Sequence, residues 1–269
     1  MAEVRLAFSA TDLHDHFLAT LQPTDFVVVD QDLVVRDFSS FTRSHYSQLD
    51  IAVLVDASQS TSRQFPVEAA NTIQLISRTP GIPDDSFSIV AFHDLKPALL
   101  CSGNCRNLSV EARLPAVRSG GFTPLYDSIV FAARRLGQDS RPDVRRTLIL
   151  FSDGADTISL ASYSDALMAA LANGVAIYSV DVSPRPHTAP GTLALRALAD
   201  GTGGRYFPIE AGNDTVIDAV LEDFHAAYVV TYKLPSRAAG FHSVRLLPTH
   251  DLGLQFHCRR GYYFSDPEN

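Results

Sequence analysis

The chain contains 269 residues, of which 46% are hydrophobic and 19% are charged, and its formal net charge is −8. This composition indicates a globular protein with enough chain for one large domain, or for one domain with a small companion. The negative balance argues against nucleic acid as a partner, because the sequence has no basic cluster that would neutralise phosphates.

Residues 1–17, MAEVRLAFSATDLHDHF, alternate between apolar and polar side chains and lack the uninterrupted apolar core of a signal peptide. No stretch reaches the roughly 18–20 apolar residues of a membrane-spanning helix, so no transmembrane segment is expected. We expect an extracytoplasmic protein, secreted, periplasmic or on the cell surface, whose signal segment is absent from this sequence; a cytoplasmic location stays open. His14 and His16 are interpreted as sharing one face of a strand, with a metal pair as the less favoured alternative.

Both ends of the chain read as antiparallel strands. Residues 4–38 and 228–264 alternate in polarity, carry turn signals such as Gln22-Pro23, and show no convincing helix. A lone hairpin is marginally stable, so we expect the two ends to pair into a small β-subdomain beside a central domain. The expected division is 1–45 for the first flank, 46–227 for the central domain and 228–269 for the second flank.

The central domain opens on residues 49–55, LDIAVLV, a continuous apolar run of strand length. Such a run predicts a strand that is buried on both faces and is therefore parallel and central. The next residues, 56–60 (DASQS), lie just past its carboxyl end, where open α/β sheets place their sites. The alternative is a helix N-cap, since Asp and Ser favour that position for backbone reasons alone.

Further along, strand and helix patterns alternate. Strands are predicted at 86–94, up to Ser152, at 174–182 and within 202–207; helices are predicted at 63–78, 110–117, after Thr123, at 160–172, through Leu193 and Leu198, and at 214–227. This alternation predicts an α/β fold with a doubly wound, mainly parallel sheet that is flanked by helices.

The three cysteines leave the redox state open. Cys101 and Cys105 bracket the short loop CSGNC, which either closes as a disulfide in an oxidising compartment or holds two free thiols. Their spacing is a poor zinc signature because no second ligand pair accompanies it. Cys258 is interpreted as an ordinary half-buried thiol.

Oxygen-bearing side chains gather in three separate pieces, DASQS (56–60), GGFTPLYDS (120–128) and LILFSDGAD (148–156). Hydroxyl and carboxylate oxygens without thiol or imidazole suit Mg²⁺, with Mn²⁺ or Ca²⁺ possible, and argue against zinc. The nearby Asp127 and Asp156 are left outside the metal set, as outer acceptors or helix caps. The candidate metal ligands are Asp56, Ser58, Ser60, Thr123 and Asp153.

The order Asp-x-Ser-x-Ser, Gly-Gly-x-Thr and Ser-Asp-Gly resembles the von Willebrand factor type A domain with a complete metal-ion-dependent adhesion site. The resemblance covers roughly residues 49–230 and implies that the five residues above hold the metal. Segments at 25–38, 202–207, 228–234 and 259–264 are similar to a bacterial group of related proteins that is common in acidobacteria, which implies no particular ligand.

Three functions stay open. The favoured one is a cation-dependent adhesion or assembly module whose metal accepts an acidic side chain of a protein partner, as the resemblance implies. The first alternative is a metal-assisted hydrolase. The sequence has no Gly-x-Ser-x-Gly elbow, His-Glu-x-x-His or Walker loop, and 201–205 (GTGGR) has the wrong order for a dinucleotide site, so we expect no enzyme. The second alternative is a scaffold without a metal-dependent ligand.

Overall fold

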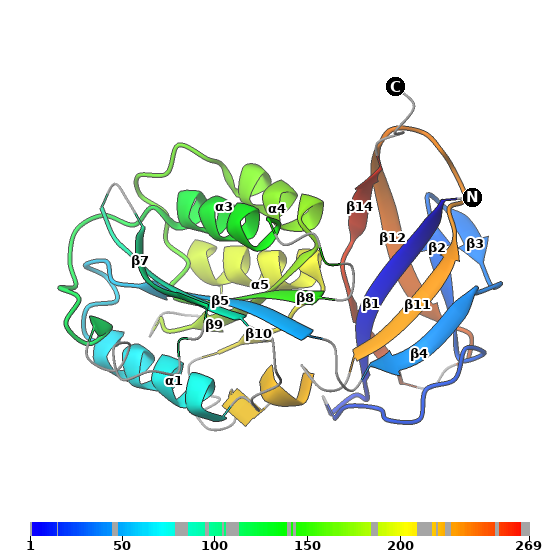
Figure 1. Cartoon of the computed structure of the whole chain (residues 1–269), viewed down its shortest axis with the longest axis horizontal. Coiled ribbons are helices and arrows are strands. Elements are labelled where there is room, and N and C mark those ends of the chain that lie inside the picture. The colour runs from blue at the N-terminus through cyan, green and yellow to red at the C-terminus, as the bar shows by residue number, and fades with distance from the viewer. Residues whose placement is uncertain are drawn as a thin grey trace.

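The computed structural model describes two neighbouring parts of one chain, an α/β part and an all-β part (Figure 1). None of the described helices is long and apolar enough to cross a membrane. The described residues are 2–14, 16–44, 48–78, 86–94, 97–103, 105, 113–138, 141, 144–183, 188–208, 217–218, 220–223, 227–250 and 253–264.

The α/β part is built on a six-stranded sheet with the order β10-β9-β8-β5-β6-β7. All neighbours pair in parallel except β6 and β7, so the mainly parallel sheet predicted from the sequence is confirmed. The strands are β5 (Gln48–Asp56), β6 (Ser86–Phe92), β7 (Ala98–Gly103), β8 (Val144–Ser152), β9 (Val175–Asp181) and β10 (Tyr206–Phe207).

Helices cover both faces of this sheet. Figure 1 shows α1 on one side and α3, α4 and α5 on the other. Along β5, Val53 packs in the cluster that contains Phe65 of α1, whereas Leu54 packs in the cluster that contains Leu125 of α3. Strand β5 is therefore buried on both faces, as its continuous apolar sequence predicts. The helices are α1 (Phe65–Arg78), α3 (Leu125–Leu136), α4 (Tyr163–Ala172) and α5 (Pro190–Thr202).

Several predicted bounds differ from the structure. Helix α4 begins at Tyr163 because Ser162 and Asp165 form a capping box there, which sets the start later than residue 160. Ala227 belongs to a strand rather than to the last predicted helix, whose described residues at 217–218 and 220–223 are helical. The helix predicted at 110–117 falls partly outside the described residues.

The two chain ends pair as predicted and form two four-stranded antiparallel sheets, with orders β13-β1-β11-β4 and β14-β12-β2-β3. Between them, the ring of Phe8 contacts Phe26 edge-to-face at a centroid distance of 5.1 Å and stacks on Tyr228 at 5.7 Å. The strands are β1 (Glu3–Thr11), β2 (Phe26–Asp30), β3 (Leu33–Val35), β4 (Ser40–Ser44), β11 (Ala227–Lys233), β12 (Gly240–Pro248), β13 (Gln255–Cys258) and β14 (Gly261–Phe264).

Of the two alternatives for Cys101 and Cys105, the structure has the disulfide. Cys101 on β7 is bonded to Cys105, with their Cα atoms 5.9 Å apart. Cys258 is a free, partly buried thiol on β13, as expected. The disulfide therefore links β7 to Cys105, which follows the end of that strand at Gly103.

Candidate metal site

The site is built on the last residues of two neighbouring parallel strands. Asp56 ends β5 and has no exposed surface, and Ser152 ends β8. The Ser152 hydroxyl donates a 2.6 Å hydrogen bond to Oδ2 of Asp56, and the backbone N–H of Ser58 donates a 2.9 Å bond to Oδ1. The Thr61 hydroxyl donates to the carbonyl of Asp56 at 2.7 Å. Ser152 and Ser58 therefore fix the Asp56 carboxylate at the carboxyl edge of the sheet, and Thr61 holds its backbone.

Backbone hydrogen bonds join the first two predicted pieces. The N–H of Gly120 donates to the carbonyl of Ala57 at 2.7 Å, and the N–H of Gln59 donates to the carbonyl of Gly121 at 3.1 Å. These two bonds place the glycine loop against the loop that follows β5. The glycines have positive φ, +151° and +77°, which favours glycine over other residues at both positions.

The second and third pieces are joined in the same way. The N–H of Thr157 donates to the carbonyl of Thr123 at 2.9 Å, and the Thr157 hydroxyl accepts from the N–H of Thr123 at 2.8 Å. Asp153 follows β8 directly, and its Oδ1 accepts from the N–H of Ala155 at 3.0 Å. All three pieces thus meet at one edge of the sheet.

The five candidate ligands differ in their access to solvent. Asp56 and Ser58 have no exposed surface, whereas Thr123 and Asp153 are 3% and 5% exposed. Ser60 is exposed, and its Oγ lies 3.3 Å from that of Ser58. The set therefore runs from the buried end of β5 to the molecular surface.

Burial raises the pKa of the Asp56 carboxyl to about 6, and the negative charge of Asp153 adds to this rise. The hydrogen bonds from Ser152 and Ser58 act in the opposite direction, because they stabilise the ionised form. Two carboxylates that share a buried edge repel each other. A divalent cation between them would remove that repulsion, so the donor set fits a hard cation.

Glu68 is a third acidic group that the sequence analysis did not single out. It lies on α1, is only 2% exposed, and neither carboxyl oxygen has a hydrogen-bond partner among the described residues. Burial, followed by the charges of Asp56 and Asp153, raises the pKa of this carboxyl to about 9. The sequence feature that could have identified Glu68 is its position. It lies within the apolar stripe of a helix that also buries Phe65 and Ala69.

Asp127 and Asp156 act as caps rather than as parts of the donor set. The Asp127 carboxylate accepts from the N–H groups of Leu160 and Ala161 at 3.0 and 2.9 Å. Asp156 accepts from the N–H of Tyr126, in the first turn of α3, at 3.3 Å. Both carboxylates hold the loop after β8 against the start of α3, which keeps Thr123 beside that loop.

Two other sequence features were considered as sites: the pair His14 and His16, and residues 201–205. His14 and His16 lie in a turn after β1 instead of in the predicted strand, because Asp12 accepts both of their backbone N–H groups. Residues 201–205 form the end of α5 and a turn, with Gly203 at φ +79°, as expected. In the described part of the chain no three His, Cys, Asp or Glu side chains are grouped to hold a metal. The five-residue set contains only two carboxylates and depends on hydroxyls for the rest.

A mainly parallel, doubly wound sheet with oxygen-bearing side chains at its carboxyl edge defines an open α/β domain. Such domains place their binding sites at this edge. The family model for the von Willebrand factor type A domain matches residues 50–220, and the chain belongs to that family. Membership implies a protein-interaction or adhesion-type module. No curated protein matches the chain.

Two solved structures resemble it at low sequence identity. One is an aerotolerance-related membrane protein from Bacteroides fragilis NCTC 9343, with multiple mutations to serines; it is 16% identical, has a TM-score of 0.49, and the match covers 65% of this chain and 98% of that one. The other is the conserved hypothetical protein BatB from Bacteroides thetaiotaomicron, 14% identical with a TM-score of 0.50, matched over 66% and 97%. The BatB match supports the fold alone.

Proposed function

We propose that this chain is a divalent-cation-dependent protein-binding module, used in adhesion or assembly. The cation, Mg²⁺ by preference and Mn²⁺ or Ca²⁺ as alternatives, accepts an acidic side chain of a protein partner. The observation that supports the proposal is that hydrogen bonds bring the three sequence pieces that carry the proposed ligands together at one sheet edge. The proposed ligands are Asp56, Ser58, Ser60, Thr123 and Asp153.

The chemistry of this set leaves the cation attractive to an anion. Magnesium prefers six oxygens in a near-octahedral arrangement and usually keeps water or an outside oxygen among them. Two carboxylates offset the charge of a divalent ion only partly when one of them acts through water, and hydroxyls add no charge. Ser60 is exposed, which supports access by a partner from solvent on that side.

The hydrolase alternative needs a base that can activate water beside the metal. The nearby carboxylates of Asp127 and Asp156 accept backbone N–H groups, and Glu68 is almost fully buried. We therefore favour binding over catalysis, and the family membership points the same way. The scaffold alternative differs from both in predicting that loss of the cation changes no partner binding.

We also propose an extracytoplasmic location. The disulfide between Cys101 and Cys105 supports it, since such bonds persist in oxidising compartments and are rare in the cytosol of mesophiles. Counting alkylated cysteines by mass spectrometry tests this, after the protein from its native host is unfolded with an alkylating agent and no reductant. A single alkylated cysteine supports the proposal, and three alkylated cysteines contradict it.

The first experiment is calorimetric titration of Mg²⁺ and Mn²⁺ into metal-stripped protein. Asp56→Asn and Asp153→Asn preserve side-chain shape but remove charge, so each is expected to weaken binding at least tenfold. Asp32→Asn is the matched control, because that carboxylate is exposed and pairs with Arg245 on the β part. Absence of saturable binding in the wild type, or equal binding in all four proteins, would overturn the cation site.

The second experiment tests the acidic partner. With Mn²⁺ bound, a carboxylate that enters the coordination sphere displaces water and lowers the water-proton relaxation enhancement. A short peptide containing glutamate is expected to lower it, while the same peptide with glutamine leaves it unchanged. If both peptides change the relaxation enhancement equally, the cation does not select a carboxylate, and the scaffold alternative is favoured.

A further inference from the structure

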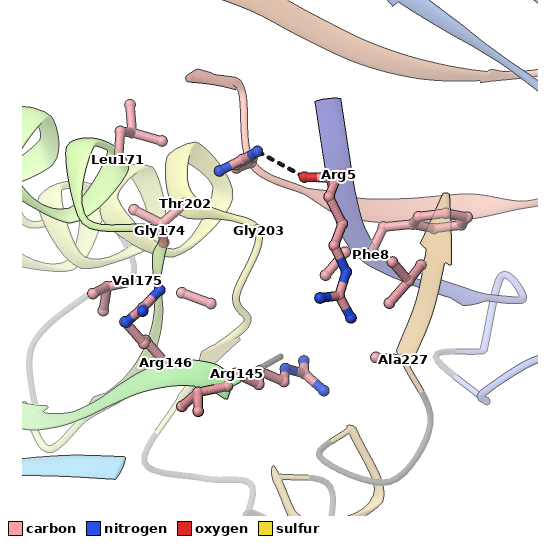
Figure 2. Close-up of a pocket in the computed structure, with 15 residues that line it drawn as sticks. Arg5, Phe8, Arg145, Arg146, Leu171, Gly174, Val175, Thr202, Gly203 and Ala227 are labelled. Carbon is pink, nitrogen blue, oxygen red and sulfur yellow. Dashed lines mark hydrogen bonds between the residues drawn. The ribbon is translucent and has the colours of Figure 1, made fainter. Parts of the chain in front are cut away.

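A second candidate site lies between the α/β part and the β part, away from the sheet edge that carries Asp56. It is a cavity of about 190 Å³ lined by residues of β1, β8, β9 and β11, the ends of α4 and α5, and the bridge residue after β13 (Figure 2). Its volume is below the ~300–1,000 Å³ of typical drug-sized ligand sites, so it suits a small ligand. Four arginines line it: Arg5, Arg145, Arg146 and Arg259.

This concentration of positive charge is unusual in a chain whose net charge is −8. No Asp or Glu is among the described residues that line the cavity. Figure 2 shows the side chain of Arg5 extending from β1 toward the end of Arg145, which comes from β8. Guanidinium groups from the two parts of the molecule therefore line the same cavity.

Hydrogen bonds to neutral acceptors orient three of these guanidinium groups. Arg145 donates to the Tyr178 hydroxyl at 2.8 Å, and Arg146 donates from Nε to the carbonyl of Leu136 at 3.1 Å. Arg259 donates to the carbonyl of Arg5 at 3.0 Å, the dashed line in Figure 2. These hydrogen bonds fix the positions of the three guanidinium groups.

Nearby carboxylates offset part of this charge. Asp223 is electrostatically coupled to Arg145, but its Oδ1 is paired with Arg205 at 3.2 Å. Glu3 lines a neighbouring hollow of about 450 Å³ that shares Arg5, Arg146 and Arg259 with the cavity. The hollow gives space for the remainder of a ligand whose charged end occupies the arginine cavity.

The side chain of Arg259 gives the most specific evidence for a ligand in this cavity. Its Nε is buried and has no hydrogen-bond partner among the described residues. Buried donors without partners are rare because they lose their water without compensation. The backbone of Arg259 is tied to the α/β part by a bridge with Thr202, so the donor is held beside the cavity.

We infer that this arginine cavity binds a small multivalent oxyanion, a phosphate or a carboxylate, between the two parts of the molecule. Planar guanidinium groups match the paired oxygens of such anions and form charge-assisted hydrogen bonds with them. Because Arg5 and Arg259 come from the β part and Arg145 and Arg146 from the α/β part, a bound anion would also hold the two parts together.

The test is calorimetric titration of inorganic phosphate into the metal-stripped full chain, in metal-free buffer from which the chelator has been removed, so that the proposed cation site stays empty. Arg259→Gln and Arg146→Gln are expected to weaken phosphate binding at least tenfold each. Arg245→Gln is the control, because Arg245 is exposed and pairs with Asp32. Methyl phosphate and succinate, titrated in parallel, distinguish a phosphate ester or a dicarboxylate from free phosphate as the preferred ligand.

Thermal unfolding separates anion binding from a purely structural role of the arginines. The wild type should unfold at a higher temperature as phosphate increases, and this rise should be lost in Arg259→Gln and Arg146→Gln. If one variant does not fold, the other carries the test. No saturable binding of any of the three anions, or an equal rise in wild type and variants, would overturn the inference. The Asp56→Asn variant should keep phosphate binding, which separates this site from the proposed cation site.

Discussion

The hydroxyl of Ser152 donates a 2.6 Å hydrogen bond to Oδ2 of Asp56 and so joins the ends of β8 and β5. Both side chains are fully buried. The bond holds one oxygen of the Asp56 carboxylate in a fixed direction, while the N–H of Ser58 holds the other. Ser152 is thus a positioning residue for the proposed cation ligand.

Ser152→Ala should weaken Mg²⁺ binding by about tenfold, the lower end of the loss seen when outer-shell partners of metal ligands are removed. The missing hydrogen bond also removes a group that stabilises the ionised form of Asp56. The measurement is calorimetric titration, with Ser164→Ala as a control at an exposed position on α4. If Ser152→Ala binds Mg²⁺ as tightly as this control does, the positioning role is refuted.

Glu68 should make the metal-free protein less stable as pH rises. Its folded-state pKa of about 9 lies above the unfolded value of 4.5, so between these values the folded state binds more protons than the unfolded state. The free energy of unfolding therefore falls with rising pH, by up to about 1.4 kcal/mol per pH unit for one proton. Below pH 4.5 and above pH 9 this contribution no longer changes.

Glu68→Gln removes the titrating group and should flatten this slope between pH 6 and 9, above the folded-state pKa of about 6 of Asp56. Urea unfolding in the presence of a chelator measures it, with the exposed Glu3→Gln as control. Equal slopes in the wild type and Glu68→Gln would show that Glu68 does not hold its proton in the folded protein.

The loop that carries Thr123 depends on Gly121. Its φ is +77°, and a Cβ there would lie 2.0 Å from Oδ1 of Asp94, which accepts the N–H of Phe122. Gly121→Ala should therefore lower the free energy of unfolding by about 1–3 kcal/mol and weaken Mg²⁺ binding. Gly103→Ala is the matched control, because its φ is +88° but nothing lies within 4 Å of the added Cβ.

The difference between these two variants isolates the clash from the cost of positive φ. Urea unfolding gives the stability and calorimetry gives the cation affinity. A Gly121→Ala protein that matches Gly103→Ala in both measurements would mean that Asp94 moves aside without disturbing Thr123.

The sequence predicted the central strands well because a strand buried on both faces must be continuously apolar. Strand β7 was missed for the same reason. It is an antiparallel edge strand in which Leu100 is buried while Leu99 and Ser102 are exposed, and its apolar run is short, from Ala98 to Cys101. The pairing of the chain ends was predicted correctly, because neither end forms a stable sheet alone.

The candidate site was predictable only in part. Ligand types and their order along the chain can be read from the motif pieces, but the bond from Ser152 to Asp56 depends on how β8 lies beside β5. Glu68 lies on α1, and the lack of a hydrogen-bond partner for its carboxyl group depends on which residues of other segments pack around it. Both are consequences of packing between segments that are distant in the sequence. The division at residues 45 and 227 and the metal set itself stay predictions.

The β part contains a buried network around Asp30 that gives a final prediction. Asp30 has no exposed surface, and its Oδ2 accepts hydrogen bonds from the hydroxyls of Tyr262 at 2.7 Å and Tyr232 at 2.8 Å. Nδ1 of His242 lies 3.7 Å from Oδ1. The network joins β2 to β11, β12 and β14, so it links the two ends of the chain.

Tyr262→Phe removes one of these bonds and leaves a buried carboxylate with less compensation. A hydrogen bond to a charged group contributes about 1.5–3 kcal/mol, so the free energy of unfolding should fall by that amount. The neighbouring Tyr263→Phe is the control, because Tyr263 is 42% exposed on the same strand and should change stability by less than about 0.5 kcal/mol. Urea unfolding at pH 7 measures both. If the two variants lose equal stability, Asp30 is compensated by its other partners, and the Tyr262 hydroxyl does not stabilise the pairing of the chain ends.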